Sequence, residues 1–200
     1  MEPLIHGIIL AFGLILPLGV QNVFIFSQGA VQPKLFRALP ATITAAMCDT
    51  MLIIFAVFGL SMIVLQFEML RIGLMAVGVI FLLYMGYIIW RSEPTLSETH
   101  QPLPARKQII FALSVSLLNP HAILDIVGVI GTSALKYVGS EQLLFTFACI
   151  FVSWIWFFCL VLAGAGMKRL DRTGRVLIVV NKCSALFIWG TAIYLLTGLI

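Results

Sequence analysis

Two aspartates lie within long apolar segments, where an ionisable side chain is costly. Asp49 stands in the segment TAAMCDTMLII, and Asp125 ends the segment LLNPHAILD. At the centre of a lipid bilayer a single aspartate costs about 3 kcal/mol. Such residues commonly mark substrate or proton pathways, so we expect Asp49 and Asp125 to bind a cation and to exchange protons. The structural alternative for Asp49 is a hydrogen bond to Thr44, Thr50 or the backbone that merely holds helices together.

Two apolar segments each contain a proline close to their middle. Pro17 lies in ILPLGVQN, and Pro120 lies in LLNPHAILD. Proline removes one helical hydrogen bond and clashes with the carbonyl group four residues earlier, so both helices are predicted to break there. When the two prolines are aligned, Asn22 falls on Asp125, and each break is followed by a polar side chain. Broken backbone at this depth is tolerated where it is buried in protein or lines a wet cavity, although a simple proline kink is the alternative.

The residues around the two breaks suit a binding cavity. Asn119 is a typical N-cap and Pro120 a typical first helical residue, so a half-helix should begin there with its positive dipole end directed into the cavity. Gly19 would let the backbone approach a ligand closely. The predicted substrate-binding residues are Asp125, Asn119, Pro120, Pro17, Gly19, Gln21 and Asn22.

The residues that couple substrate transport to a second ion are predicted among the ionisable groups near the middle of the membrane. Asp49, Asp125 and His121 are the predicted coupling residues, although His121 would equally suit a bond to a carbonyl group freed by the break. Asn181 belongs either to this polar layer or to a hydrogen bond between helices.

Composition places these segments in a membrane. The chain of 200 residues is 62% hydrophobic and 10% charged, whereas a typical soluble domain has about 25% charged residues. Six apolar runs have the length needed to span a bilayer, and they cover residues 4–27, 39–65, 70–90, 108–134, 143–167 and 176–198. The predicted fold is an all-α membrane protein with six transmembrane helices, in which helices one and four are broken at Pro17 and Pro120.

One polar connection divides the chain into halves. The stretch RSEPTLSETHQPLPARK, residues 91–107, is rich in proline, serine and glutamate and is predicted to be a cytoplasmic linker. Residues 1–90 then form a first three-helix repeat, and residues 108–200 form a second. Because each half has an odd number of spans, related halves must be inverted in the membrane, as is common in secondary transporters.

The basic residues predict the orientation. Of the 12 lysine and arginine residues, ten follow spans one, three or five, and two lie on the opposite face. By the positive-inside rule, both termini lie outside the cytoplasm. The N-terminal MEPLIHG lacks the basic region of a signal peptide, so the first run is expected to be a retained span. The net charge of +4 thus reports orientation, and no nucleic-acid partner is expected.

The predicted cavity is acidic. No lysine or arginine lies deep in any predicted span. A zwitterion with an additional positive charge would suit this arrangement, with its carboxylate at the half-helix and its cationic group at an aspartate. The four cysteines lack metal-binding spacing, so no metal or cofactor is expected.

Three stretches of the chain resemble one family. LPLGVQNVFIFSQG, the pair Cys48-Asp49 and LNPHAILD are similar to the basic-amino-acid branch of the LysE family. The resemblance runs from the first predicted span to the last. It implies an exporter of L-lysine, L-arginine or close analogues in the bacterial plasma membrane, and a homodimer. At Val20 the chain departs from many relatives, which have a second proline there.

Exchange against protons is the simplest hypothesis for the mechanism, because export of a cation from a negative interior needs a coupling ion. An exporter of another amino acid, metal or small cation is an alternative within transport. An intramembrane aspartyl protease is an alternative from another class, but the Gly-x-Gly-Asp motif of those enzymes precedes neither Asp49 nor Asp125. A structural subunit or receptor would not require two matching breaks.

Overall fold

The computed structural model describes residues 1–16, 19–60, 68–91, 102–119, 122–123, 125–170 and 175–197. Within these ranges every regular element is a helix, which confirms the predicted all-α class. The elements are α1 (Glu2–Ile15), α2 (Val20–Val31), the 3-10 helix η1 (Leu35–Ala38), α3 (Leu39–Phe55), the π-helix η2 (Ala56–Leu60), α5 (Glu68–Arg91), α6 (Ala105–Leu117), the π-helix η3 (Asp125–Gly131), α8 (Thr132–Ala134), α9 (Ser140–Leu170) and α10 (Arg175–Thr197).

Two stretches of described helix are long and apolar enough to cross a bilayer. They are Leu35–Gly59, which contains α3, and Ser140–Met167, which contains most of α9. The α1 and α2 helices meet at an angle of 79° and would make a third span if they form one broken helix. The described parts of all six predicted apolar runs are helical apart from Leu16, Gly19, Leu118 and Asn119, but six spans and an inverted repeat stay a prediction.

The first predicted break coincides with the end of a helix. The α1 helix ends at Ile15 and α2 begins at Val20. The carbonyl group of Gly19 accepts the amide of Val23 at 3.1 Å, which is the first hydrogen bond of α2 and makes Gly19 its N-cap. Pro17 itself lies outside the described residues. The backbone thus stops being α-helical near the middle of the first apolar run.

The second break has the same kind of backbone hydrogen bond as the first, but a different type of helix follows it. The α6 helix ends at Leu117, and the carbonyl group of Asn119 accepts the amide of Ile123 at 3.1 Å, the bond expected of an N-cap residue. Pro120 lies outside the described residues. Beyond the break, Asp125–Gly131 forms a π-helix rather than the regular half-helix that the sequence predicts. Such wide turns often occur at functional sites.

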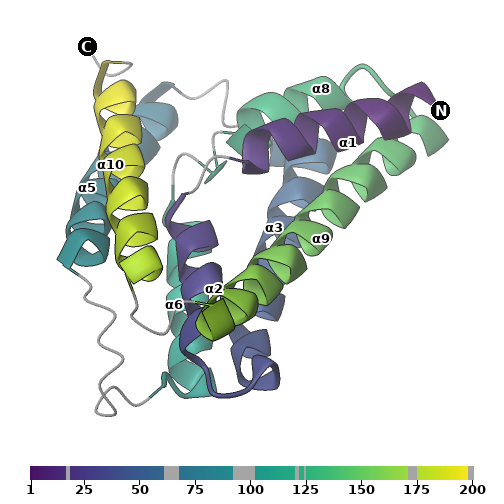
Figure 1. Ribbon diagram of the computed structural model, residues 1–200. Helices are drawn as coiled ribbons and strands as arrows, with labels where there is room; N and C mark the ends of the chain where they lie inside the picture. The colour runs from purple at the N-terminus through teal and green to yellow at the C-terminus, as the bar shows by residue number, and fades with distance from the viewer. Residues whose placement is uncertain are drawn as a thin grey trace.

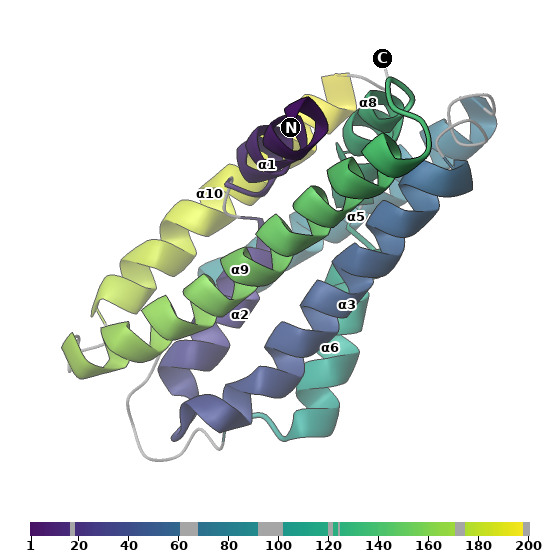
Figure 2. The same ribbon diagram turned by 90° about the vertical axis from the view of Figure 1, so that its right-hand side faces the viewer.

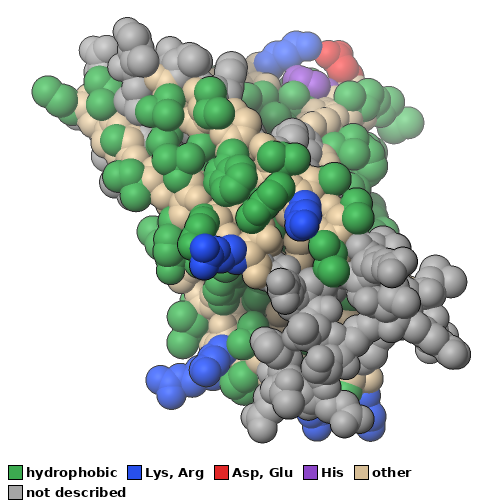
Figure 3. All heavy atoms as spheres, turned by 60° about the vertical axis from the view of Figure 1, so that its left-hand side comes forward, with side chains coloured by type: hydrophobic (Ala, Val, Ile, Leu, Met, Phe, Trp, Pro, Cys, Tyr) green, Lys and Arg blue, Asp and Glu red, His purple; other side chains and the backbone are tan. Residues whose placement is uncertain are grey.

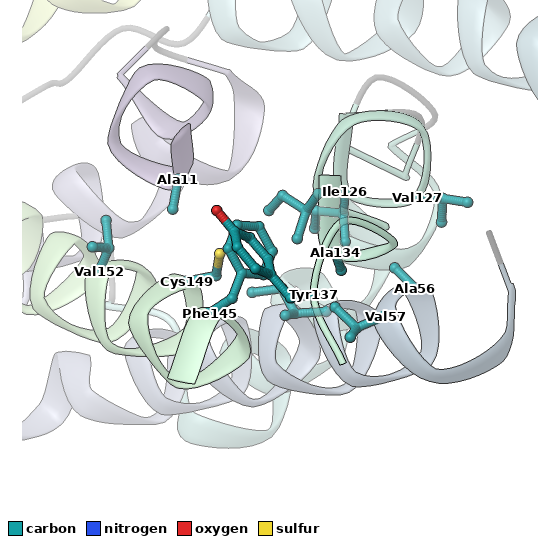
Figure 4. Packing of buried hydrophobic residues seen from close by; sticks show 12 residues of the cluster. Ala11, Ala56, Val57, Ile126, Val127, Ala134, Tyr137, Phe145, Cys149 and Val152 are labelled. Atoms are coloured by element: carbon teal, nitrogen blue, oxygen red, sulfur yellow. The ribbon is translucent and has the colours of Figure 1, made fainter. Parts of the chain in front are cut away.

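The long helix α9 is the support for the first half of the chain. In Figures 1 and 2, α1 and α2 follow one another along α9, and α3 also packs against it. Figure 4 shows the apolar cluster at one end of these contacts, where Ala11 of α1, Phe145 and Cys149 of α9 and Ile126 of η3 meet. The broken helix is therefore held on both sides of its break by a helix from the other half.

The α5 and α10 helices form a separate pair. They lie side by side in Figure 1, and the rings of Trp90 and Trp189 meet across the pair at a tilt of 32°, with centroids 5.6 Å apart. A second apolar cluster joins this pair to α2, with Leu82 of α5 and Ile188 of α10 in the same cluster as Val20. The pair thus closes the side of the molecule that α9 does not cover.

The outer faces of the helices are apolar. Figure 3 shows hydrophobic side chains spread over the side formed by α5 and α10, where Ile80 is 70% and Ile193 is 60% exposed. On α9, Phe147 and Leu162 are also exposed. Exposed apolar surface of this extent marks contact with a membrane or a partner. It agrees with the prediction that these helices face lipid.

Two glycines let α2 and α9 approach each other closely. A Cβ atom at Gly164 of α9 would overlap the carbonyl oxygen of Phe26 in α2, and one at Gly29 of α2 would overlap the carbonyl oxygen of Val161. Real side chains do not approach backbone this closely. Small residues at such positions let two helices of a membrane protein pack backbone to backbone.

Replacement of this glycine should loosen α2 from α9. Gly164→Ala is expected to lower the free energy of unfolding by about 1–3 kcal/mol, the usual cost of overpacking a tight contact. The thermal unfolding midpoint in detergent measures the effect. Gly166→Ala is the matched control, because a Cβ atom there meets no other atom within 4 Å. Equal midpoints for the two variants would contradict the close contact.

Candidate functional site

A cavity of about 100 Å³ lies between the broken helix and the helices around it. Its walls come from α1, α2, α3, α5, α9, α10, η3 and the break after α6, so both halves of the chain contribute. The lining residues are Ala11, Leu14, Ile15, Gly19, Gln21, Asn22, Asp49, Ile53, Leu82, Asn119, Ala122, Asp125, Ile126, Ile130, Cys149, Ser153, Phe157 and Ile188. Most are apolar. Four of the polar residues lie near the two breaks, and the other two are Asp49 of α3 and Ser153 of α9.

Asp49 is a buried carboxylate group of the cavity, and both of its oxygens accept hydrogen bonds. Its side chain is only 7% exposed. Gln21 of α2 donates from Nε2 to its Oδ1 at 3.1 Å, and Ser153 of α9 donates from Oγ to its Oδ2 at 3.0 Å. Both donors are neutral, so they solvate the carboxylate group without cancelling its charge. A buried carboxylate without a cationic partner is costly and readily takes up a cation or a proton.

The two threonines near Asp49 bond to the backbone of α3. Thr44 donates to the carbonyl oxygen of Pro40, and Thr50 donates to that of Ala46, each within its own helix. Neither threonine is the partner of Asp49. A neighbouring bond does hold the helices together, because Trp154 of α9 donates from Nε1 to Oγ1 of Thr50 at 3.0 Å. Asp49 itself bonds to side chains that line the cavity.

Asn22 bridges the first break. Its Nδ2 donates to the carbonyl oxygen of Ile15 at 2.9 Å, across the interruption between α1 and α2. The last carbonyl groups of a helix have no amide donor within the helix, so they need another hydrogen-bond donor when they are buried. Asn22 supplies that donor and also lines the cavity. The sequence predicts a substrate contact at Asn22, and the structure adds this stabilising role for the broken backbone.

The second break contributes two polar residues. Asp125 begins η3 and is half-buried in the cavity wall. Asn119 is 6% exposed, and its side-chain oxygen accepts no hydrogen bond from the described residues. A buried acceptor without a donor costs about 1–3 kcal/mol. Asn119 therefore presents an unused acceptor beside a cavity that also contains two carboxylate groups.

The structure brings most of the predicted site residues together. Those that line one cavity are Gly19, Gln21, Asn22, Asp49, Asn119 and Asp125. Asn181 of α10 is buried but is not among the lining residues, which favours its interpretation as a contact between helices. Pro17, Pro120 and His121 lie outside the described residues.

Sequence reasoning missed the contribution of α9. Ser153 donates to Asp49, and Cys149 and Phe157, one turn to either side, complete the wall. The available signal was a single serine in the middle of the run ACIFVSWIWFF. Serine is a common contact residue between membrane helices, so the sequence alone did not distinguish Ser153 from such a residue.

The charge of the described lining is negative. It contains two aspartates and no lysine, arginine or histidine. Among the described residues no group of three or more histidine, cysteine or carboxylate side chains is arranged to hold a metal ion. The cavity thus suits a ligand that brings its own positive charge and makes hydrogen bonds to amide and hydroxyl groups.

Comparison with known proteins identifies the family. The family model described as LysE type translocator matches residues 12–199. A protein of Bacillus subtilis (strain 168) with the name "Putative amino-acid transporter YisU" is 56% identical over 97% of this chain and 89% of its own length. The "Arginine exporter protein ArgO" of Pectobacterium carotovorum (strain PC1) is 30% identical over 96% of this chain and 95% of its own length. No solved structure matches the chain.

Apolar helices around a buried acidic cavity, together with this match, define a membrane transporter rather than an enzyme. The chain belongs to the LysE type translocator family. This confirms the resemblance drawn from LPLGVQNVFIFSQG and LNPHAILD, and it excludes the intramembrane protease alternative.

The bond from Ser153 to Asp49 should contribute to stability. In Ser153→Ala one carboxylate oxygen of Asp49 loses its donor, so the free energy of unfolding should fall by about 1–3 kcal/mol. The thermal unfolding midpoint of the purified protein measures this loss. Ser114→Ala is the control, because Ser114 donates to the carbonyl oxygen of Ile110 at the exposed surface of α6. If both variants unfold at the wild-type midpoint, the bond contributes nothing.

Proposed function

We propose that the protein exports basic L-amino acids, lysine and/or arginine, from the bacterial cytoplasm in exchange for protons. The observation that carries this proposal is the buried Asp49 carboxylate, held by neutral donors in a cavity that it shares with Asp125. The relative named as an arginine exporter supports a basic substrate. The more similar relative is named only as an amino-acid transporter, so the choice between lysine and arginine rests on experiment.

Export of a cation requires coupling. Moving one positive charge out of a negative interior costs about 2.3 kcal/mol per 100 mV. If one proton enters for each monovalent cation that leaves, no net charge crosses the membrane and this cost disappears. The proton gradient then drives export. A carboxylate group that holds either the substrate cation or a proton, but not both, is sufficient for such an exchange.

Asp125 is our first candidate for the exchanging group and Asp49 our second. Asp125 is half-buried at the start of a π-helix, next to the second break, so a substrate can reach it without disturbing the bonds of Asp49. Both oxygens of Asp49 accept hydrogen bonds, so Asp49 would keep the cavity acidic whether Asp125 holds a substrate cation or a proton. His121, which lies outside the described residues, is proposed as a relay between Asp125 and the aqueous side.

We also propose that residues 1–90 and 108–200 are inverted repeats joined by a cytoplasmic linker at 91–107. The two breaks support the inverted repeat, because the carbonyl groups of Gly19 and Asn119 each accept the first hydrogen bond of the helical turn that follows. Both termini would lie outside the cytoplasm. In Figures 1 and 2, α1 begins and α10 ends at the same end of the molecule. The protein would lie in the bacterial plasma membrane, and its homodimerisation stays a prediction.

Export by whole cells tests the substrate. Bacteria that lack their own basic-amino-acid exporters are loaded with lysine- or arginine-containing dipeptides, and the amino acids released are measured over time. Cells that produce the protein should release lysine or arginine several-fold faster than cells with an empty vector. Alanine-containing dipeptides provide the neutral control. Release of neutral amino acids alone would overturn the assignment of a basic substrate.

Proteoliposomes test the role of Asp125. With a pH gradient as the only driving force, Asp125→Asn should abolish transport, because the amide cannot exchange a proton for a cation. Transport should fall to the level of empty liposomes. Glu141→Gln is the control, since Glu141 is an exposed carboxylate in the first turn of α9. If Asp125→Asn transports as well as the wild type, Asp125 is not the exchanging group.

A further inference from the structure

The N-terminus of α2 lies at the cavity. No acidic side chain in the first turn of the helix offsets its positive dipole end. The helix has 12 residues, its N-cap is Gly19, and its first turn contains no acidic side chain. Glycine has no side chain with which to accept hydrogen bonds from the first amides of α2. Such amides, together with the helix dipole, form a site for a carboxylate or another anion. Asp49 reaches α2 through the side chain of Gln21.

Gly19 also leaves room for a ligand. A Cβ atom at this position would meet no other atom within 4 Å, and Gly19 lines the cavity. The backbone angles, φ −69° and ψ 174°, are extended and available to any residue. Neither packing nor conformation therefore requires glycine here, unlike at Gly29 and Gly164. Open space beside the first amides of a helix allows a ligand to bind closely.

Asn119 supplies a second, independent indication of a ligand. Asn119 lines the same cavity, and its buried side-chain oxygen has no donor among the described residues. An ammonium group is a donor that would satisfy this oxygen. A cavity of about 100 Å³ brings Gly19 and Asn119 within the reach of one small molecule. The acceptor and the anion site together match the two charged groups at the α-carbon of an amino acid.

We propose that the N-terminus of α2 at Gly19 binds the α-carboxylate of the substrate and that the Asn119 side-chain oxygen accepts from its α-ammonium group. This inference rests on the proposed function, because it divides the cavity into a head-group subsite and an acidic subsite at Asp125 for the side-chain cation. It assigns the carboxylate to the first break rather than to the half-helix after Asn119. The head-group subsite recognises an amino acid whatever its side chain.

Competition by modified substrates tests the head-group subsite. Proteoliposomes that contain the protein and unlabelled amino acid take up the same radiolabelled amino acid by counterflow. L-lysine is compared with L-lysinamide and cadaverine, which lack the carboxylate, and with Nα-acetyl-lysine, which lacks the α-ammonium group. Each modified compound should compete about tenfold or more weakly than lysine, a difference of about 1.4 kcal/mol in binding free energy.

Gly19→Ala is the decisive variant. Its methyl group enters open space, so the protein should fold and elute from size-exclusion chromatography like the wild type. The methyl group would obstruct the carboxylate, so the half-saturating concentration of lysine should rise about tenfold while that of lysinamide changes less. The advantage of lysine over lysinamide should therefore shrink. Gly13→Ala is the matched control, since its Cβ atom also meets nothing within 4 Å and Gly13 does not line the cavity.

Two results would overturn the head-group subsite. The first is equal competition by lysine, lysinamide and cadaverine in the wild type. The second is a Gly19→Ala protein that retains the full wild-type preference for lysine over lysinamide. If the wild type transports a different amino acid, the proposed basic substrate is wrong, but the same comparison between that amino acid and its amide still tests the subsite. Asn119→Ala provides a second variant, in which discrimination against the Nα-acetyl compound should be lost.

Discussion

The site depends on the buried carboxylate group of Asp49, whose donors among the described residues are neutral. The cost of burying Asp49 is partly offset by Gln21 and Ser153, which belong to α2 and α9. Gln21 can reach Asp49 because α1 stops at Ile15 and a new helix starts at Val20, at a 79° angle to the first. The broken helix and the buried charge are thus parts of one arrangement.

The second half of the chain holds the first half in place. The α9 helix packs along α1 and α2, and the close approach of Gly164 to Phe26 and of Gly29 to Val161 brings the backbones of α2 and α9 together. Through Ser153, the same helix reaches the carboxylate on α3. A displacement of α9 against α3 would therefore change the hydrogen bonds of Asp49. Under the proposed function, this connection would link the binding of a ligand at Asp49 to the positions of α3 and α9 relative to each other.

The sequence allowed the composition of the site to be predicted, but not its detailed geometry. Polar groups in apolar segments must gather or be solvated, which is why Gln21, Asn22 and Asp49 could be assigned to one cavity. Ser153 could not, since its hydrogen-bond partner depends on the rotation of α9 about its own axis. The π-helix at Asp125–Gly131 was also missed, because one additional residue in a turn leaves no clear mark in an apolar run.

The absence of lysine and arginine from the described lining has a mechanistic consequence. A resident cation beside Asp49 or Asp125 would neutralise the carboxylate permanently, and neither a substrate cation nor a proton would then be needed. Amide and hydroxyl donors stabilise the carboxylate group without this effect, so its charge remains available to a ligand. In the proposed mechanism the amides of α2 would provide positive potential at the first break, where a helix dipole acts over a single turn. An anion site there, separate from the aspartates of the same cavity, would let a zwitterion with an additional positive charge bind, whereas a proton at a carboxylate group would suffice for the return.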